Sequence, residues 1–170
     1  RVSDNEAPDP MTLRRPVIDP FWENVPLAGL STAQWEALCD RCGRCCLEKL
    51  TNRRNGKVYY TSIACTLLDT VSCHCRDYRH RQRTVPQCVQ LTPDNLLSCR
   101  WLPRTCAYRL LWEGKPLPAW HPLITGTPDS VHDAGISIRG RRLHAMPPHA
   151  DEIAAYIVDW GIWSKRARAD

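Results

Sequence analysis

Several common signatures are absent from this 170-residue sequence. No apolar run approaches the roughly 18 residues of a membrane-spanning helix, so we expect no membrane segment. The polar, proline-rich start, RVSDNEAPDPM, lacks the charged-then-apolar pattern of a secretion signal, and we expect a cytoplasmic protein. There is no G-x-S-x-G motif, P-loop or dinucleotide-binding fingerprint, which argues against the enzyme classes that depend on them.

Phenylalanine is also scarce: the chain has one Phe but seven Trp and five Tyr. Trp and Tyr carry a polar group that usually needs a partner when buried. We therefore expect a core with polar seams, or aromatic walls around a site. A chain of this length most often forms one domain with room for a real apolar core.

The local patterns predict a small, loop-rich α+β fold with short helices and hairpins. Residues 1–20 contain four prolines and predict an extended N-terminal arm. Residues 21–170 are expected to form a single cysteine-rich, metal-binding domain. Ser31 and Gln34 have the spacing of a capping box and predict a helix that ends near the first cysteine. Asn55-Gly56 predicts a turn before a strand over 58–63.

Four further elements are predicted after residue 90. A short helix begins after Thr92, and another begins at about Cys106, capped by Thr105 and stopped at Gly114. Two alternating runs around Gly140 predict a hairpin. The segment DEIAAYIVDWGIW predicts a helix with Ile153, Ile157 and Trp160 on one face.

Ten cysteines lie between residues 39 and 106, and none follows. Cytoplasmic thiols stay reduced, so this pattern indicates metal binding or catalysis rather than disulfides. Cys39, Cys42 and Cys45 have C-x2-C-x2-C spacing, which aims three thiolates at one centre, as in the [4Fe–4S] loops of bacterial ferredoxins. A structural zinc ion more commonly takes two cysteines from each of two knuckles. The adjacent Cys46 favours a cluster or two sites, although multinuclear zinc–thiolate arrangements also fit.

The downstream cysteines differ in their support as ligands. Cys73 and Cys75 would project to one face of an extended segment, with His74 on the other face and therefore at the surface. Cys106 begins a predicted helix, where free backbone N–H groups favour a thiolate. Cys99 has no such support and is expected to be a small buried side chain.

Basic residues adjoin these cysteines at Arg76, Arg79, Arg81 and Arg83. They form either a solvated face or a set of donors that neutralise metal-bound thiolates. The formal charge of +5 raises nucleic acid as a partner. Two four-thiolate centres, at −2 each, would bring the total close to neutral, so we do not expect nucleic-acid binding.

A Cys–His nucleophile pair is a further alternative, because the chain has six histidines. Nothing distinguishes one thiol as the attacking group, and whether the protein is an enzyme stays open. Trp120, His121 and His132 are candidates for lining a pocket, but ordinary packing is the favoured interpretation.

The cysteine motif resembles a known family. CDRCGRCC, followed by Cys65, CRDYRHR and Cys88, resembles the zinc- or iron-chelating CxxCxxCC domain of the bacterial YkgJ superfamily. WLPRTCAYRLLWEGKPLPAWHPL, SVH and GISIRGR resemble its YcgN-like branch, so the match covers about residues 22–142. The resemblance implies nine metal or cofactor ligands: Cys39, Cys42, Cys45, Cys46, Cys65, Cys73, Cys75, Cys88 and Cys106. Cys99 does not belong to the pattern.

We therefore expect a cytoplasmic metalloprotein with one or two cysteine-ligated centres, most simply [4Fe–4S] clusters. Its role would be redox chemistry, sensing or an accessory step, with a protein redox or client partner. The alternative is a zinc-binding structural or interaction module, or a metal-handling protein that chelates Zn²⁺. Neither hypothesis involves a membrane.

Overall fold

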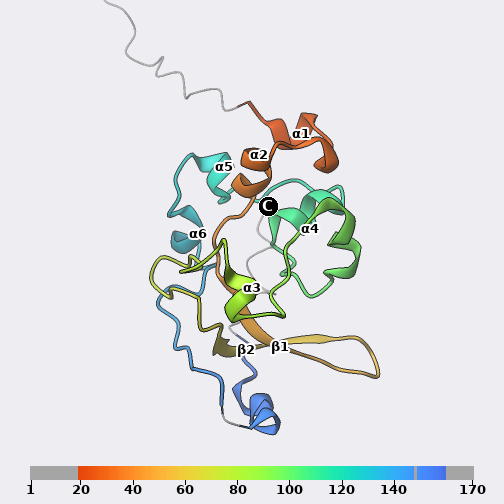
Figure 1. Ribbon diagram of the computed structural model, residues 1–170. Helices are drawn as coiled ribbons and strands as arrows, with labels where there is room; N and C mark the ends of the chain where they lie inside the picture. The colour runs from red at the N-terminus through yellow and green to blue at the C-terminus, as the bar shows by residue number, and fades with distance from the viewer. Residues whose placement is uncertain (1–18, 148, 160–170) are drawn as a thin grey trace, which may run out of the picture.

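The computed structural model describes residues 19–147 and 149–159, and it consists of short helices, one hairpin and long connecting loops (Figure 1). The predicted small, loop-rich α+β fold is confirmed. The α-helices are α1 (Phe21–Asn24), α2 (Thr32–Ala37), α3 (Arg81–Thr84), α4 (Ala107–Trp112), α5 (Pro122–Thr125) and α6 (Ser130–Asp133). The 3-10 helices are η1 (Leu27–Gly29), η2 (Arg44–Cys46), η3 (Pro93–Ser98) and η4 (Ala150–Tyr156). The predicted N-terminal arm lies outside the described residues except for its last two positions.

The hairpin lies below the labelled α-helices in Figure 1, with η4 on its other side. β1 (Leu47–Thr51) pairs with β2 (Val58–Ala64) in antiparallel register, with an irregularity next to Leu47. The connecting turn contains Asn55 and Gly56, and Gly56 has a φ of +67°, which glycine adopts at little cost. The predicted turn and strand are confirmed.

Helix α2 forms for the reason that the sequence predicts. The Ser31 hydroxyl accepts a hydrogen bond from the Gln34 N–H at 3.2 Å, and the Gln34 side chain accepts one from the Ser31 N–H at 2.9 Å. This capping box satisfies N–H groups that the first turn leaves free. Helix α4 begins later than predicted, because Cys106 rather than Thr105 occupies its N-cap position.

The hairpin predicted around Gly140 and the final helix do not form as predicted. Both segments pair with the edge of β2 instead. The chain turns at Gly140, but His144 then pairs with β2 through hydrogen bonds with Ser62 (2.8 Å) and Ala64 (2.9 Å), so no local hairpin forms. The predicted final helix is a 3-10 helix that ends at Tyr156. Ile157 then bridges to β2, which places it outside the helix, and Trp160 lies outside the described residues.

Two apolar clusters form most of the core. The first contains Trp22, Leu38, Leu96, Leu102 and Tyr108 and joins α1, α2, η3 and α4. The second contains Leu47, Leu68, Cys73 and Ile138, next to the hairpin. Side chains from both clusters line the cavity described below. No helix in the described ranges is long and apolar enough to cross a membrane.

Candidate metal centre

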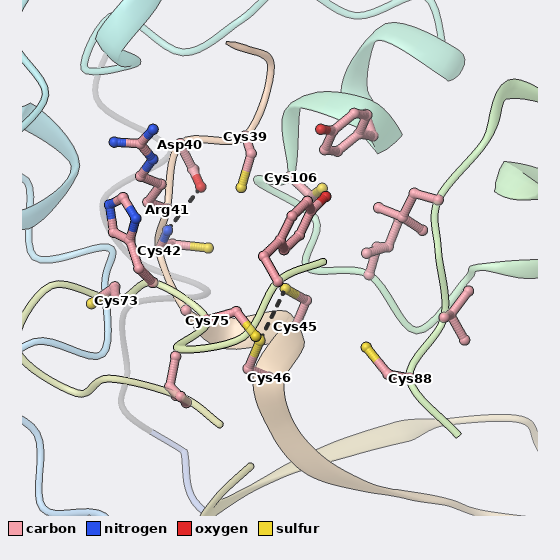
Figure 2. Close-up of a pocket in the computed structure, with 18 of the residues that line it drawn as sticks. Cys39, Asp40, Arg41, Cys42, Cys45, Cys46, Cys73, Cys75, Cys88 and Cys106 are labelled. Atoms are coloured by element: carbon pink, nitrogen blue, oxygen red, sulfur yellow. Dashed lines mark hydrogen bonds between the residues drawn. The ribbon is translucent and has the colours of Figure 1, made fainter. Parts of the chain in front are cut away.

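A cavity of about 380 Å³ lies among α2, α4, η2 and the loops around α3 (Figure 2). Its size is within the range of small-molecule and cofactor sites. Nine of the ten cysteines line it: Cys39, Cys42, Cys45, Cys46, Cys65, Cys73, Cys75, Cys88 and Cys106. These are the nine residues predicted as ligands, and the fold brings them together from positions up to 67 residues apart. Their binding of a metal stays a prediction.

The tenth cysteine lies elsewhere. Cys99 belongs to the first apolar cluster, is only 4% exposed and does not line the cysteine cavity. Its thiol lies 3.9 Å from the side-chain oxygen of Asn95. The prediction of a small buried side chain at this position is confirmed.

The loop after α2 directs its cysteines inward through two residues with positive φ. Arg41 has a φ of +58° and Gly43 a φ of +73°. A Cβ atom at Gly43 would lie 2.5 Å from Cγ1 of Ile138, so no other residue fits without movement. The buried Asp40 carboxylate accepts a hydrogen bond from the Cys42 N–H at 3.0 Å and fixes the turn between them.

The Cys45 and Cys46 thiols form a pair with sulfur atoms 3.9 Å apart. This hydrogen bond lowers the pKa of Cys45 to about 7 and raises that of Cys46, because the Cys46 thiol keeps its proton and donates it. The positive charge of Lys49 also stabilises the Cys45 thiolate. Lys49 is held beside the pair by the carbonyl oxygens of Cys45 (2.8 Å) and Leu47 (2.6 Å).

Burial raises the pKa of the neighbouring thiols, which is the opposite of the shift at Cys45. Enclosure by the cavity walls raises the pKa of Cys39 and Cys42, and that of Cys106 to about 12. The negative charge on Cys45 raises all three further. A bound cation would remove this repulsion and favour the thiolate form. A metal ion bound here would therefore displace thiol protons.

The segment after β2 places the next cysteines. The Cys65 N–H donates to the Cys46 carbonyl at 2.8 Å, and Cys75 pairs with Leu68 in an isolated bridge. Cys73 has a φ of +59°, so the segment is not the extended strand on which the expectation of a shared face for Cys73 and Cys75 depends, although both residues line the cavity. Figure 2 shows the Cys73 sulfur directed away from the other labelled thiols. His74 is exposed, as predicted.

Residues 77–89, the cavity strap, contain α3 and Cys88 and form part of the cavity lining. Among the hydrogen bonds of the described residues, only the one from Tyr78 to the Glu36 carboxylate (2.9 Å) joins the strap to the rest of the protein. Arg81 stacks on Tyr78, with 4.0 Å between the guanidinium carbon and the ring centroid, and lines the cavity. The other three arginines of the basic run, Arg76, Arg79 and Arg83, are exposed.

Charged side chains behind Cys42 were not found from the sequence. Asp40 and Arg44 are 5% and 1% exposed, and burial raises the pKa of the Asp40 carboxyl while it lowers that of Arg44. The fully buried His121 accepts from the Leu123 N–H at 3.1 Å, and its Nε2 lies 3.2 Å from the Leu38 carbonyl oxygen. Trp120, His121 and His132 do not line the cavity, so the packing interpretation is confirmed for them. The only sequence signal was the presence of charged residues inside the cysteine motif.

The donor set suits soft metals, since thiolates select zinc and iron–sulfur clusters. Four sulfurs at about 2.3 Å from one zinc ion would lie about 3.8 Å from one another, and the Cys45–Cys46 pair has a comparable separation of 3.9 Å. Across the described ranges, no three His, Cys, Asp or Glu side chains are close enough to hold one ion. The described thiols therefore do not form a closed mononuclear site as they stand.

Comparisons with known proteins agree with the cysteine pattern. Residues 38–107 match the CxxCxxCC family, described as "Putative zinc- or iron-chelating domain". A UPF0260 protein of Gluconacetobacter diazotrophicus is 52% identical over 141 residues, which are 83% of this chain and 87% of the relative. One from Sinorhizobium medicae is 48% identical over 151 residues, 89% and 97% of the two chains. The chain belongs to the UPF0260 family. No solved structure matches it.

In this UPF0260 protein the matched segment contains all the candidate ligands but not their whole environment. All ten cysteines fall within residues 38–107, as does the strap. Ile138 and His121, which fix the cysteine loop from behind, lie beyond it. The expected CxxCxxCC identity is confirmed, and metal chelation is the property that the family description names.

Proposed function

We propose that this UPF0260 protein binds [4Fe–4S] clusters in the cysteine cavity and serves a redox, sensing or accessory role in the cytoplasm. The observation that carries the proposal is the convergence of nine cysteines on one cavity of about 380 Å³. Within it, Cys39, Cys42 and Cys45 come from one loop with the spacing of [4Fe–4S] ligands. Cys106, at the start of α4, faces the same space from the other side (Figure 2).

The width of the cavity favours clusters over a single zinc ion. In a mononuclear site all sulfurs contract around one point, whereas each thiolate of a cluster binds a different metal atom and the thiolates stay farther apart. Nine thiols also exceed the four that one zinc ion takes.

A bound cluster of this kind supplies one-electron transfer. The protein contributes the surroundings that control it. Leu38, Leu102 and Tyr108 provide apolar and aromatic walls that limit water, and the Lys49 ammonium lies beside the thiols. Burial and nearby positive charge are the means by which proteins adjust cluster potentials. The exposed strap arginines, Arg79 and Arg83, would contact a protein partner that docks beside the cavity.

A zinc-binding structural or metal-handling role is the second candidate. The 3.9 Å separation of the Cys45 and Cys46 sulfurs favours it locally, because two thiolates of one zinc ion have nearly that spacing. In that case the metal would contribute folding free energy, on the order of 10 kcal/mol for a structural zinc site.

The deciding experiment is the content of iron, zinc and acid-labile sulfide per chain, in protein produced and purified without oxygen. We expect iron and sulfide in equal amounts and visible absorption that bleaches with dithionite. One or two zinc ions without sulfide would overturn the cluster proposal in favour of the zinc candidate.

A further inference from the structure

We propose that the cavity holds two adjacent four-cysteine centres joined through the Cys45–Cys46 peptide, and that Cys73 belongs to neither. This inference rests on the proposed cluster function and divides its ligands. The first centre takes Cys39, Cys42, Cys45 and Cys106. The second takes Cys46, Cys65, Cys75 and Cys88.

The first set surrounds one part of the cavity. Cys39, Cys42 and Cys45 come from the loop between α2 and η2, and Figure 2 shows their sulfur atoms directed into the space that Cys106 enters from α4. These four thiols line the same space, and their number fits the ligand number of a [4Fe–4S] cluster.

The second set comes from three backbone segments that lie side by side, plus the strap. The Cys65 N–H binds the Cys46 carbonyl at 2.8 Å, and the bridge between Leu68 and Cys75 brings the third segment next to them. In Figure 2 the Cys46 and Cys75 side chains point to the same part of the cavity, and Cys88 faces it from across the gap. Cys88 lines the cavity from a segment that contributes no other thiol.

Cys73 is the cysteine left over. It is 6% exposed and packs in the second apolar cluster with Leu47, Leu68 and Ile138. Its Cβ lies 3.5 Å from the position that a Cβ of Gly43 would occupy, at the edge of the cavity that Cys73 also lines. Packing explains its burial, and its side chain points away from both ligand sets (Figure 2).

Lys49 lies at the junction of the two centres. Its ammonium binds the Cys45 carbonyl oxygen at 2.8 Å, next to the two sulfur atoms that would belong to different centres. A cation there reduces the repulsion between two negatively charged clusters held close together. Lys49 is thus a positioning residue for the pair of centres.

The test is metal analysis and electron paramagnetic resonance of the anaerobic full chain and of two double variants. Cys39→Ser/Cys106→Ser removes ligands of the first centre only, and Cys65→Ser/Cys75→Ser those of the second. Wild-type protein should contain about eight iron and eight sulfide, and its dithionite-reduced spectrum should show interaction between two clusters. Each double variant should keep about half the iron and give the simpler spectrum of an isolated cluster. Cys73→Ser and Cys99→Ser should keep the full content.

The wild-type result does not depend on any variant folding. About four iron and four sulfide, with no interaction signal, would overturn the two-centre inference and leave the proposed function standing. Loss of all iron from both double variants, with helical circular dichroism unchanged, would also overturn it. Loss of half the iron from Cys73→Ser would overturn the ligand division. Absence of sulfide from wild-type protein would instead refute the proposed function itself.

Discussion

The sulfur atoms of Cys45 and Cys46 lie 3.9 Å apart, and the hydrogen bond between them lowers the pKa of Cys45 to about 7. In metal-free protein we therefore expect iodoacetamide to alkylate Cys45 first, with a rate that rises through a midpoint near pH 7, because the thiolate is the nucleophile. Peptide mapping by mass spectrometry measures this order.

Substitution of Lys49 tests whether its ammonium group helps to lower the pKa of Cys45. Lys49→Met should move the midpoint of Cys45 alkylation upward, since the ammonium stabilises the thiolate. Lys57→Met removes a lysine that stacks on Tyr59 at the far end of the hairpin and should leave the midpoint unchanged. Equal alkylation rates at Cys39, Cys45 and Cys106 in wild-type protein would contradict the assignment.

Gly43 is expected to be the most sensitive glycine. Gly43→Ala places a methyl group 2.5 Å from Ile138 at a φ of +73°. The positive φ costs about 1–2 kcal/mol and the overpacking about 1–3 kcal/mol of unfolding free energy. Gly56→Ala is the matched control, because its φ is +67° but nothing lies within 4 Å of the added methyl group. It should therefore cost only about 1–2 kcal/mol, the amount that the positive φ costs. Urea unfolding of the metal-free protein measures the free energy of unfolding of both variants. Equal losses would show that Ile138 moves aside at no cost.

The cavity strap should open when its one hydrogen bond to the rest of the described structure is removed. Tyr78→Phe deletes the bond to Glu36, worth about 0.5–1.5 kcal/mol, so trypsin should cut at Arg79 and Arg83 about 2- to 10-fold faster. Tyr59→Phe on the hairpin serves as the control. Metal loading should slow cleavage in both proteins, because it ties the strap through Cys88. Equal cleavage of loaded and metal-free protein would remove Cys88 from the ligand set.

His121 makes stability depend on pH. Burial lowers its pKa below the ordinary value of about 6.5, so the unfolded chain binds more protons than the folded protein in mildly acidic solution. Its contribution is complete above about pH 6.5 and is lost as the pH falls toward the folded pKa. His121→Gln should lower the free energy of unfolding at pH 8 by about 1–3 kcal/mol and flatten its decline between pH 6.5 and 5. His149 is exposed, and His149→Gln serves as the control. If His121→Gln leaves the pH dependence of the unfolding free energy unchanged, His121 is not its source.

Clustered thiols indicated a metal site, and the family resemblance identified the nine candidate ligands. Cys99 was set apart because it lies outside that pattern and no helix start favours its thiolate, and the fold places it in an apolar cluster. Local elements with complete short-range signals, such as the Ser31 capping box and the Gly56 turn, were predicted too. In each case the information lies within a few residues of the element.

The failures concern contacts between distant segments. His144 and Ile157 follow alternating or helical patterns of their own, yet both pair with β2, about 80 to 95 residues earlier in the chain. An open strand edge supplies hydrogen-bond partners that no local pattern reveals. The burial of Cys42 depends in the same way on Val131 of α6 and Ile136 just after it, which are far from it in sequence.

The close approach of Ile138 to Gly43 limits how the cysteine motif can be transplanted. The Ile138 N–H also donates to the Cys42 carbonyl at 2.9 Å, so one residue fixes both the shape and the direction of the loop. A peptide that contains only residues 38–107 would carry every thiol but would lack Ile138 and its contacts with the loop. A larger residue at position 43 would therefore need a smaller one at position 138, and it would still adopt an unfavourable positive φ.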